Sequence, residues 1–516
     1  MAAGFKIRKR EYYDSVFLMG VNKRLAESPG VDQTAVLMGT EANKRLLQEM
    51  GITGAEIESA TPNDLIVAVI AESESAVREA IDSLDGVLKT MTAGTRTSGV
   101  RTLDAALEKK PGANLAVFSI PGEYAGDEAR KALNAGLNVF IFSSNVPVEQ
   151  ELELKLLGRS RGLLVMGPDC GTSILHGVGI GFANHVRRGA IGVVGPSGTG
   201  LQEFTSQVHN AGGGISHAIG TGSKDLSDAI GGLTTFGALQ MLEGDQGTGV
   251  IAIVAKPPGS ETLHALLQQA KPLTKPLIGC FLGIDNVSFN DAESIQWALT
   301  IDDAVSLALG AAGIEPASAQ DSGEAKDEAS VGSIRASWSP EAHFLRGVFA
   351  GGTFCYQTQQ ILRQAGLAVF SNSPLNAGNG LVNSDRSVDH TVVDMGDENY
   401  TLGKPHPMID STERGRRILA EAADPSVAIL LLDFILGYNA ASDPVGDLLD
   451  ALVEAQASRE KAGSPLTIVA SVCGTDEDPQ DRALQVKMLR EIGVHIFGSN
   501  ARATKFCVQL LKGRER

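Results

Sequence analysis

Cysteine, aromatic side chains and positive charge are scarce in this chain of 516 residues. It has five cysteines, 5% aromatic residues, and 44 Lys and Arg against 61 Asp and Glu, a net charge of −17. A balance this acidic repels phosphate backbones and anionic lipid headgroups. Nucleic acid and membrane surfaces are therefore excluded as expected partners. The cysteines form no CxxC pair, which is typical of free thiols in a reducing cytoplasm.

Long apolar runs are also missing. The most apolar stretch, SVAILLLDFILGY at 426–438, contains Asp433 and is too short to span a membrane. The amino-terminal segment MAAGFKIRKREYYDS has basic residues but no apolar segment after them, unlike a signal peptide. We therefore expect a cytoplasmic protein with no membrane-spanning segment.

Glycine is abundant: 59 residues, about 11% of the chain against a usual ~7%. Short apolar runs bounded by Gly and Pro alternate with amphipathic segments, a pattern typical of parallel strands buried on both faces. The sequence therefore predicts an α/β fold with parallel sheets throughout. The predicted strands are 65–70, 115–120, 139–142, 162–167, 190–195, 249–255 and 276–283.

A polar segment rich in Ala, Ser, Asp and Glu, residues 315–340, predicts a flexible linker. On both sides of it a strand, a Gly-rich turn, a helix and a second strand recur, at 115–145, 347–373, 467–500 and more loosely 190–220. Two explanations stay open: ordinary βαβ units of a doubly wound sheet, or duplication of a phosphate-binding half-domain.

The strongest local motif is GPSGTG at 195–200, directly after a predicted strand. Gly198 and Gly200 permit a tight turn, and Ser197 and Thr199 supply hydroxyls at the start of a helix over 201–210. Free amides and the positive end of the helix dipole would stabilise a phosphate there. The motif is neither a Walker A loop nor a dinucleotide fingerprint, so neither ATP nor NAD is implied.

A second turn of this kind, AGGTFC at 350–355, places Gly351, Gly352 and Thr353 at a helix start. A single turn could equally be a plain helix cap, whereas two such turns on successive domains favour one shared anion site.

Two further residues are candidates for chemistry. Lys256 follows the predicted strand 249–255, at the sheet edge where ligands of open α/β folds collect. It is either a partner for phosphate or carboxylate, or a solvated surface lysine. His406 lies between two prolines, which suits proton transfer or phosphate contact; a structural role is the alternative.

Cysteine and histidine are the other residue types that could carry chemistry here. Cys170 at a turn is either a nucleophile or a buried, inert thiol. No metal site is predicted, because four histidines in one stretch lack ligand spacing on a common face. They are His176, His185, His209 and His217.

The motifs resemble a known family. MGPDCGTSI at 166–174 and AIGVVGPSGTG at 190–200 resemble the α subunit of succinyl-CoA synthetase, and residues from about 340 to 510 resemble the ligase domain of its β subunit. Together with TPNDLIVAV, KPP and GKPHPMID in this order, the whole chain resembles the FdrA family of acyl-CoA synthetase-like proteins.

The resemblance implies four regions. These are a CoA-binding-like Rossmann domain with an amino-terminal extension (1–185), a flavodoxin-like ligase domain (186–314), the linker (315–340) and a second flavodoxin-like ligase domain (341–516). In the related ligases two helix N-termini face each other across a phosphohistidine, and the two glycine turns described above correspond to them. CoA is implied by the resemblance alone.

Several features depart from the related ligases. No histidine follows PLIGCFLG at 276–283, where they carry a phosphorylated loop, and Lys256 stands in place of a glutamate. SVFLMG at 15–20, predicted as the first strand, is not followed by a Gly-rich CoA loop, and no ATP-grasp segment is present.

These departures favour direct binding of a phosphorylated small molecule. The family resemblance implies a subunit of a multi-subunit oxamate carbamoyltransferase that uses carbamoyl phosphate in allantoin breakdown, with Lys256 and the helix ends holding the phosphate. An NDP-forming acyl-CoA synthetase and a non-catalytic anion-binding scaffold are the alternatives.

Overall fold

The computed structural model describes residues 2–11, 13, 15–92, 100, 102–284, 295–315, 328–401 and 405–512. The chain divides into two compact units: Met1–Ala113 with Glu398–Pro405, and Asn114–Asp397 with His406–Arg516. The division after Ala113 falls inside the region 1–185 that the sequence predicts as one domain. The predicted Rossmann domain and the two predicted ligase domains stay predictions.

The first unit contains a three-stranded antiparallel sheet in the order β1-β3-β2. Helices cover both faces of the sheet: α1 and α4 pack on one face, and apolar residues of α2 and α3 pack on the other. The elements are β1 (Ala2–Arg8), α1 (Ser15–Ala26), β2 (Val31–Met38), α2 (Glu41–Glu49), α3 (Ala55–Glu58), β3 (Leu65–Ala71), α4 (Glu74–Thr92), α5 (Leu103–Lys109) and, from the later segment, α14 (Glu398–Thr401).

Two predictions for this unit are wrong. The run at 65–70 is the central strand β3 of an antiparallel sheet, not a parallel strand. Helices bury both of its faces, and burial on both faces produces the same continuous apolar run as a parallel sheet. The run at 15–20 begins helix α1 instead of forming a strand, because Leu18, Val21 and Leu25 recur at helical spacing and are all buried.

The second unit begins with a small parallel sheet, β4-β5-β6, followed by a seven-stranded sheet in the order β13-β12-β11-β9-β10-β7-β8. The strands from β13 to β10 run parallel, and β7 and β8 form an antiparallel edge. The elements are β4 (Leu115–Phe118), α6 (Gly122–Asn134), β5 (Asn138–Ile141), α7 (Val148–Ser160), β6 (Val165–Met166), β7 (Thr172–Leu175), β8 (Val178–Gly181), β9 (Arg188–Gly195), α8 (Gly198–Asn210), β10 (Ile215–Gly220), α9 (Leu233–Gly244), β11 (Val250–Ala255), α10 (Ser260–Ala270), β12 (Leu277–Phe281), β13 (Ile295–Ala298) and α11 (Ile301–Ala311).

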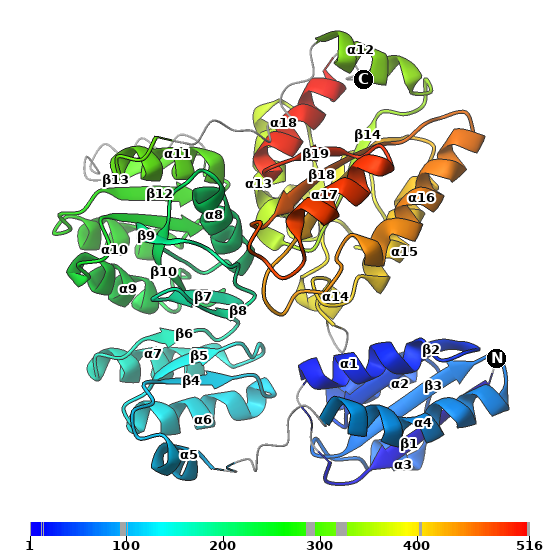
Figure 1. Ribbon diagram of the computed structural model, residues 1–516, viewed down its shortest axis with the longest axis horizontal. Helices are drawn as coiled ribbons and strands as arrows, with labels where there is room; N and C mark the ends of the chain where they lie inside the picture. The colour runs from blue at the N-terminus through cyan, green and yellow to red at the C-terminus, as the bar shows by residue number, and fades with distance from the viewer. Residues whose placement is uncertain are drawn as a thin grey trace. The chain divides into compact units, whose positions relative to one another are not determined.

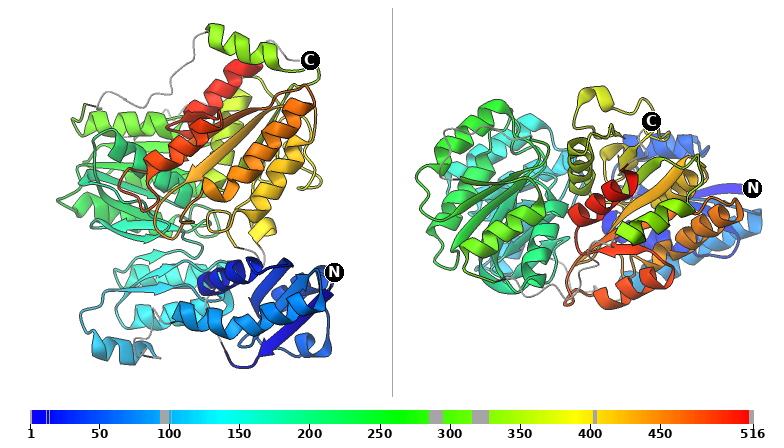
Figure 2. Two further views of the ribbon diagram at one scale, coloured as in Figure 1. Left: turned by 45° about the vertical axis from the view of Figure 1, so that its right-hand side comes forward. Right: turned by 90° about the horizontal axis from the view of Figure 1, so that it is seen from above.

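The rest of the second unit is a six-stranded parallel sheet in the order β15-β16-β14-β17-β18-β19. Helices cover both faces of each large sheet (Figures 1 and 2). The elements are α12 (Glu328–Ser337), β14 (Phe344–Phe349), α13 (Gly352–Gln364), β15 (Phe370–Ser371), the 3-10 helix η1 (Ala377–Asn379), β16 (Thr391–Asp394), α15 (Thr412–Ala422), β17 (Val427–Ile435), α16 (Gly446–Lys461), β18 (Thr467–Cys473), α17 (Arg482–Glu491), β19 (His495–Phe497) and α18 (Asn500–Leu511).

The α/β class and the parallel strands predicted between 115 and 283 are confirmed, as is the helix after GPSGTG, which starts at Gly198. The predicted linker is wrong in part. Residues 328–337 form α12, and Val331 and Trp338 are buried in the core of the six-stranded sheet. The indole of Trp338 donates a hydrogen bond to Thr467 Oγ1 (2.8 Å). Residues 316–327 of that linker lie outside the described residues.

Among the described residues, no helix combines the length and the apolar character that crossing a membrane requires.

Candidate functional site

Strand β9 leads into helix α8 at the carboxyl edge of its sheet. At Gly195 a Cβ would lie 2.0 Å from the carbonyl oxygen of Val254 on the neighbouring strand β11, so only glycine fits there. The chain then turns, and Ser197 caps the helix by accepting a hydrogen bond from the amide of Gly200 (3.2 Å). The sequence GPSGTG therefore forms a helix N-terminus directly after a buried strand.

Helix α13 begins in the same way after β14, the strand that lies between β16 and β17. Its N-cap is Gly351, which has no side chain to cap the helix. The buried carboxylate of Asp433 on β17 accepts hydrogen bonds from the amides of Ala350 and Gly351 (both 2.9 Å). The first two amides of this turn therefore already have an acceptor within the protein, the carboxylate of Asp433.

The two helix N-termini are in direct contact. The hydroxyls of Ser197 and Thr353 hydrogen-bond to each other. A Cβ on Gly351 would lie 3.1 Å from Cβ of Thr199, and one on Gly200 would lie 3.2 Å from Cγ2 of Thr353. The two glycine turns, 155 residues or so apart in the chain, thus meet at one place. Whether they bind phosphate stays a prediction.

Four amides at this contact have no hydrogen-bond acceptor among the described residues: those of Gly198 and Thr199 on α8, and of Gly352 and Thr353 on α13. Gly198, Thr199 and Gly352 are partly exposed, so solvent and small solutes can reach them. Each helix contributes about half a positive charge at its N-terminus. Two such ends in contact repel each other, and a bound anion would relieve that repulsion.

Lys256 directly follows β11, the parallel neighbour of β9, and therefore lies at the same carboxyl edge of the sheet as the start of α8. Its Nζ lies 4.0 Å from the centroid of the Tyr356 ring on α13, a cation–π geometry. Lys256 forms no ion pair with a described carboxylate within 4.0 Å, but its charge opposes the rise in the pKa of Asp394. Its role as a partner for an anion stays a prediction.

His406 lies close to the turn after β16. Burial lowers its pKa to about 4, so the ring is neutral at pH 7. Its Nδ1 accepts a hydrogen bond from the amide of Met408 (3.2 Å), which leaves the proton on Nε2. A Cβ on Gly396 would lie 2.8 Å from that Nε2. His406 could therefore donate a hydrogen bond near the site but would add no positive charge to it.

Sequence reasoning missed two carboxylates at this edge, Asp394 and Asp433. Asp433 is fully buried and its Oδ1 pairs with Arg414 (2.5 Å); burial raises its pKa and Arg414 opposes the rise. The sequence did contain a signal for Asp433, because it is the one charged residue in the apolar run 426–438. Asp394 ends strand β16, where a lone acidic residue at a carboxyl edge is a similar signal.

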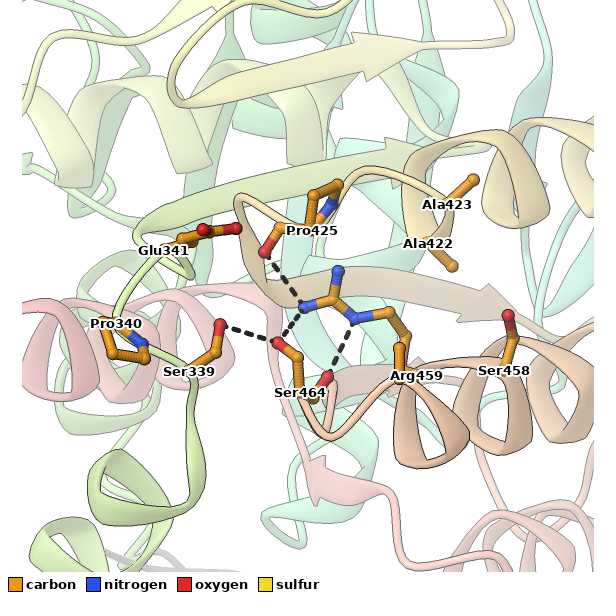
Figure 3. A pocket seen from close by; sticks show the side chains of 10 residues that line it. Ser339, Pro340, Glu341, Ala422, Ala423, Pro425, Ser458, Arg459 and Ser464 are labelled. Carbon is orange, nitrogen blue, oxygen red and sulfur yellow. Dashed lines mark hydrogen bonds between the residues drawn. The ribbon is translucent and has the colours of Figure 1, made fainter.

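A pocket of about 350 Å³ lies elsewhere, beside the segments that precede β14, β17 and β18, at the opposite edge of the six-stranded sheet (Figure 3). Arg459 is the only basic residue among the described residues that line it. Its guanidinium donates hydrogen bonds to the carbonyl oxygens of Asp424, Pro425, Val427 and Ser464. Because these hydrogen bonds use the guanidinium to hold loops together, Arg459 is not available to pair with an anion in this pocket.

The thiol of Cys170 is buried, and burial raises its pKa to about 12. The inert alternative therefore fits this cysteine better than a nucleophilic role.

The uncharacterized protein YahF of Escherichia coli strain K12 is 38% identical to this chain over 501 residues, which cover 97% of each chain. The chain belongs to the FdrA family. This family is acyl-CoA synthetase-like and related to succinyl-CoA ligases.

Other relatives of this FdrA-family chain cover parts of it. Residues 348–509 match the CoA-ligase family, and residues 1–102 match a family described as AllF, heavy metal-associated domain. The alpha subunit of ADP-forming succinate–CoA ligase from Aquifex aeolicus strain VF5 is 29% identical over 199 residues, 37% of this chain and 64% of that one. The structure of ATP citrate lyase from Methanothrix soehngenii in complex with citrate and coenzyme A matches with 14% identity and a TM-score of 0.36, over 80% of this chain and 83% of that one.

The name of the amino-terminal family raises the question of a metal. Residues 1–113 of this FdrA-family chain contain neither cysteine nor histidine. Soft metals prefer thiolate and imidazole ligands. In the part of the chain that the structure describes, no group of three or more His, Cys, Asp or Glu side chains could hold a metal ion. The residues of this unit therefore do not fit a thiolate or imidazole metal site.

Proposed function

We propose that this FdrA-family chain binds carbamoyl phosphate where the N-termini of α8 and α13 meet, and serves as a subunit of an oxamate carbamoyltransferase. The observation that carries the proposal is a set of four amides, two from each helix, that have no acceptor in the part of the chain that the structure describes and lie at one accessible contact. Backbone amides at paired helix ends are strong donors for a phosphate group.

The chemistry that such a site favours is departure of a phosphate. When an acceptor nitrogen attacks the carbonyl carbon of carbamoyl phosphate, negative charge builds up on the oxygen that leaves with phosphorus. Fixed amide dipoles and the Lys256 ammonium would stabilise that charge without reorganising. The acceptor, oxamate, and the need for further subunits rest on the family resemblance.

A proline at position 199 tests the amide donors. Proline fits the first turn of a helix but has no N–H, so Thr199→Pro would remove one of the four amides and leave α8 intact. We expect the dissociation constant for inorganic phosphate to rise about tenfold, since one hydrogen bond to a charged group contributes ~1.5 kcal/mol or more. Calorimetric titration of the full chain measures this.

The control is a conservative substitution further along the same helix, Thr205→Ser, which leaves every N-terminal amide in place. It should bind phosphate as the original chain does. Equal affinities for Thr199→Pro and the original chain, with unchanged thermal unfolding, would contradict the proposed site.

One finding favours a second candidate, an NDP-forming acyl-CoA synthetase: residues 348–509 match the CoA-ligase family. The two activities separate in a direct assay. Carbamoyl transfer from carbamoyl phosphate to oxamate, by the chain alone or with its genomic neighbours, supports the first. CoA-dependent formation of ADP or GDP from a nucleotide supports the second. Phosphate binding with neither activity would indicate an anion-binding scaffold.

A further inference from the structure

Asp394 is held rigidly beside the contact of the two helices. It ends β16, and the side chain of Asn372 fixes its main chain through two hydrogen bonds, one to Asp394 O and one from Asp394 N (both 2.9 Å). Its Oδ1 accepts a hydrogen bond from the amide of Gly396 (2.9 Å). Its Oδ2 lies against Gly352, where a Cβ would come within 2.4 Å. One carboxylate oxygen therefore faces the first residue of α13.

The surroundings of Asp394 hold charges of both signs. Burial raises its pKa to about 6, with Asp397 on the same turn and Asp433 on β17 adding to the rise; Lys256 after β11 and the Gly396 amide oppose it.

Two other titratable groups nearby add no charge at neutral pH. They are the ring of His406, whose pKa burial lowers to about 4, and the thiol of Cys355 on α13, whose pKa burial raises to about 12.

An ionised Asp394 would repel any anion bound by the amides of Gly352 and Thr353. We propose that Asp394 takes up a proton when the anion binds at the helix contact, and that it returns this proton to the phosphate as the phosphate leaves. This inference rests on the proposed function, because it assigns a proton donor to the same site.

The step balances in atoms and charge. The lone pair of the acceptor nitrogen forms a bond to the carbonyl carbon of carbamoyl phosphate, and the bond from that carbon to the bridging oxygen breaks. The bond's electrons stay on that oxygen, which takes the proton from the Asp394 carboxyl group. The proton displaced from the acceptor nitrogen then returns to the Asp394 carboxylate, which restores the starting state. No oxidant or other reactant is required.

Sulfate is the suitable probe, because it stays a dianion throughout the working range and any proton taken up belongs to the protein. The full chain is titrated with sulfate from about pH 5 to about pH 8 in two buffers of different ionisation enthalpy. We expect uptake of close to one proton above pH 6, with affinity falling about tenfold per pH unit there. Asp394→Asn should bind sulfate with nearly constant affinity and no such uptake.

Glu203→Gln is the matched control. Glu203 is a second buried carboxyl group, on α8 itself, and burial raises its pKa to about 7. It accepts hydrogen bonds from Asn500 N and Gln207, away from the helix N-terminus. This variant should keep the proton uptake. Thermal unfolding checks that each isosteric variant is folded.

A second variant shifts the effect instead of removing it. Because Asp397 raises the pKa of Asp394, Asp397→Asn should move the fall in affinity to lower pH, which a purely structural role of Asp394 would not predict. Sulfate binding without proton uptake, or uptake that persists in Asp394→Asn, overturns the role of Asp394 alone. Failure of both sulfate and phosphate to bind the original chain overturns the proposed function, and this inference with it.

Discussion

Replacing Asp433 by asparagine is expected to lower the free energy of unfolding by about 3–5 kcal/mol, because it leaves a buried arginine without its counter-charge. Asp433 is fully buried between Arg414 and the amides of Ala350 and Gly351. The guanidinium of Arg414 also donates to Val348 O, so it cannot swing out to water without breaking that bond. Urea unfolding followed by intrinsic fluorescence measures the loss.

Asp127→Asn is the control for this substitution. Asp127 also pairs with an arginine, Arg130 (2.7 Å), but its side chain is 65% exposed. Exposed pairs of this kind contribute about 1 kcal/mol or less. Equal losses in the two variants would show that the buried pair contributes no more than a surface pair, contrary to our expectation.

Reversing the charge at position 256 should have the largest effect on binding. In Lys256→Glu, a carboxylate replaces the ammonium beside an already acidic Asp394, and the change of two unit charges should weaken phosphate binding about 100-fold, after allowance for solvent screening. Lys256→Met, which keeps an apolar side chain over the ring of Tyr356, should weaken it about tenfold. Calorimetric titration with inorganic phosphate at low ionic strength measures both.

Lys271→Glu makes the same charge change at an exposed position at the end of α10. It should leave phosphate affinity nearly unchanged, and added salt should reduce any residual effect. If Lys256→Glu and Lys271→Glu weaken binding equally, only the net charge of the chain matters and Lys256 has no special place in the site.

The sequence predicted most of the second unit, because its parallel strands read as buried apolar runs that end in glycine turns. In the first unit the prediction of a parallel strand at β3 failed. Helices bury both faces of this strand, so it is apolar along its whole length, and such a run does not distinguish parallel from antiparallel neighbours. Helix α12 was missed because the few apolar residues that pack it on the core, among them Val331, Ile334 and Trp338, lie in an otherwise polar segment.

The candidate site was predictable in part. Glycine turns after strands predicted two helix N-termini, and the structure brings them together. Their direct contact through the Ser197 and Thr353 hydroxyls could not be predicted, because it depends on how two sheets pack. Nor could the orientation of Asp394 be predicted, because the side chain of Asn372 fixes its main chain and the amide of Gly396 donates a hydrogen bond to its carboxylate.

The amide donors come half from α8 and half from α13, on either side of a long stretch of the same polypeptide. Their meeting is consequently an intramolecular event, with an effective concentration fixed by the connecting chain and unaffected by dilution. Cutting the chain between residues 316 and 327 would make assembly of the two pieces depend on protein concentration, and anion affinity would then fall on dilution.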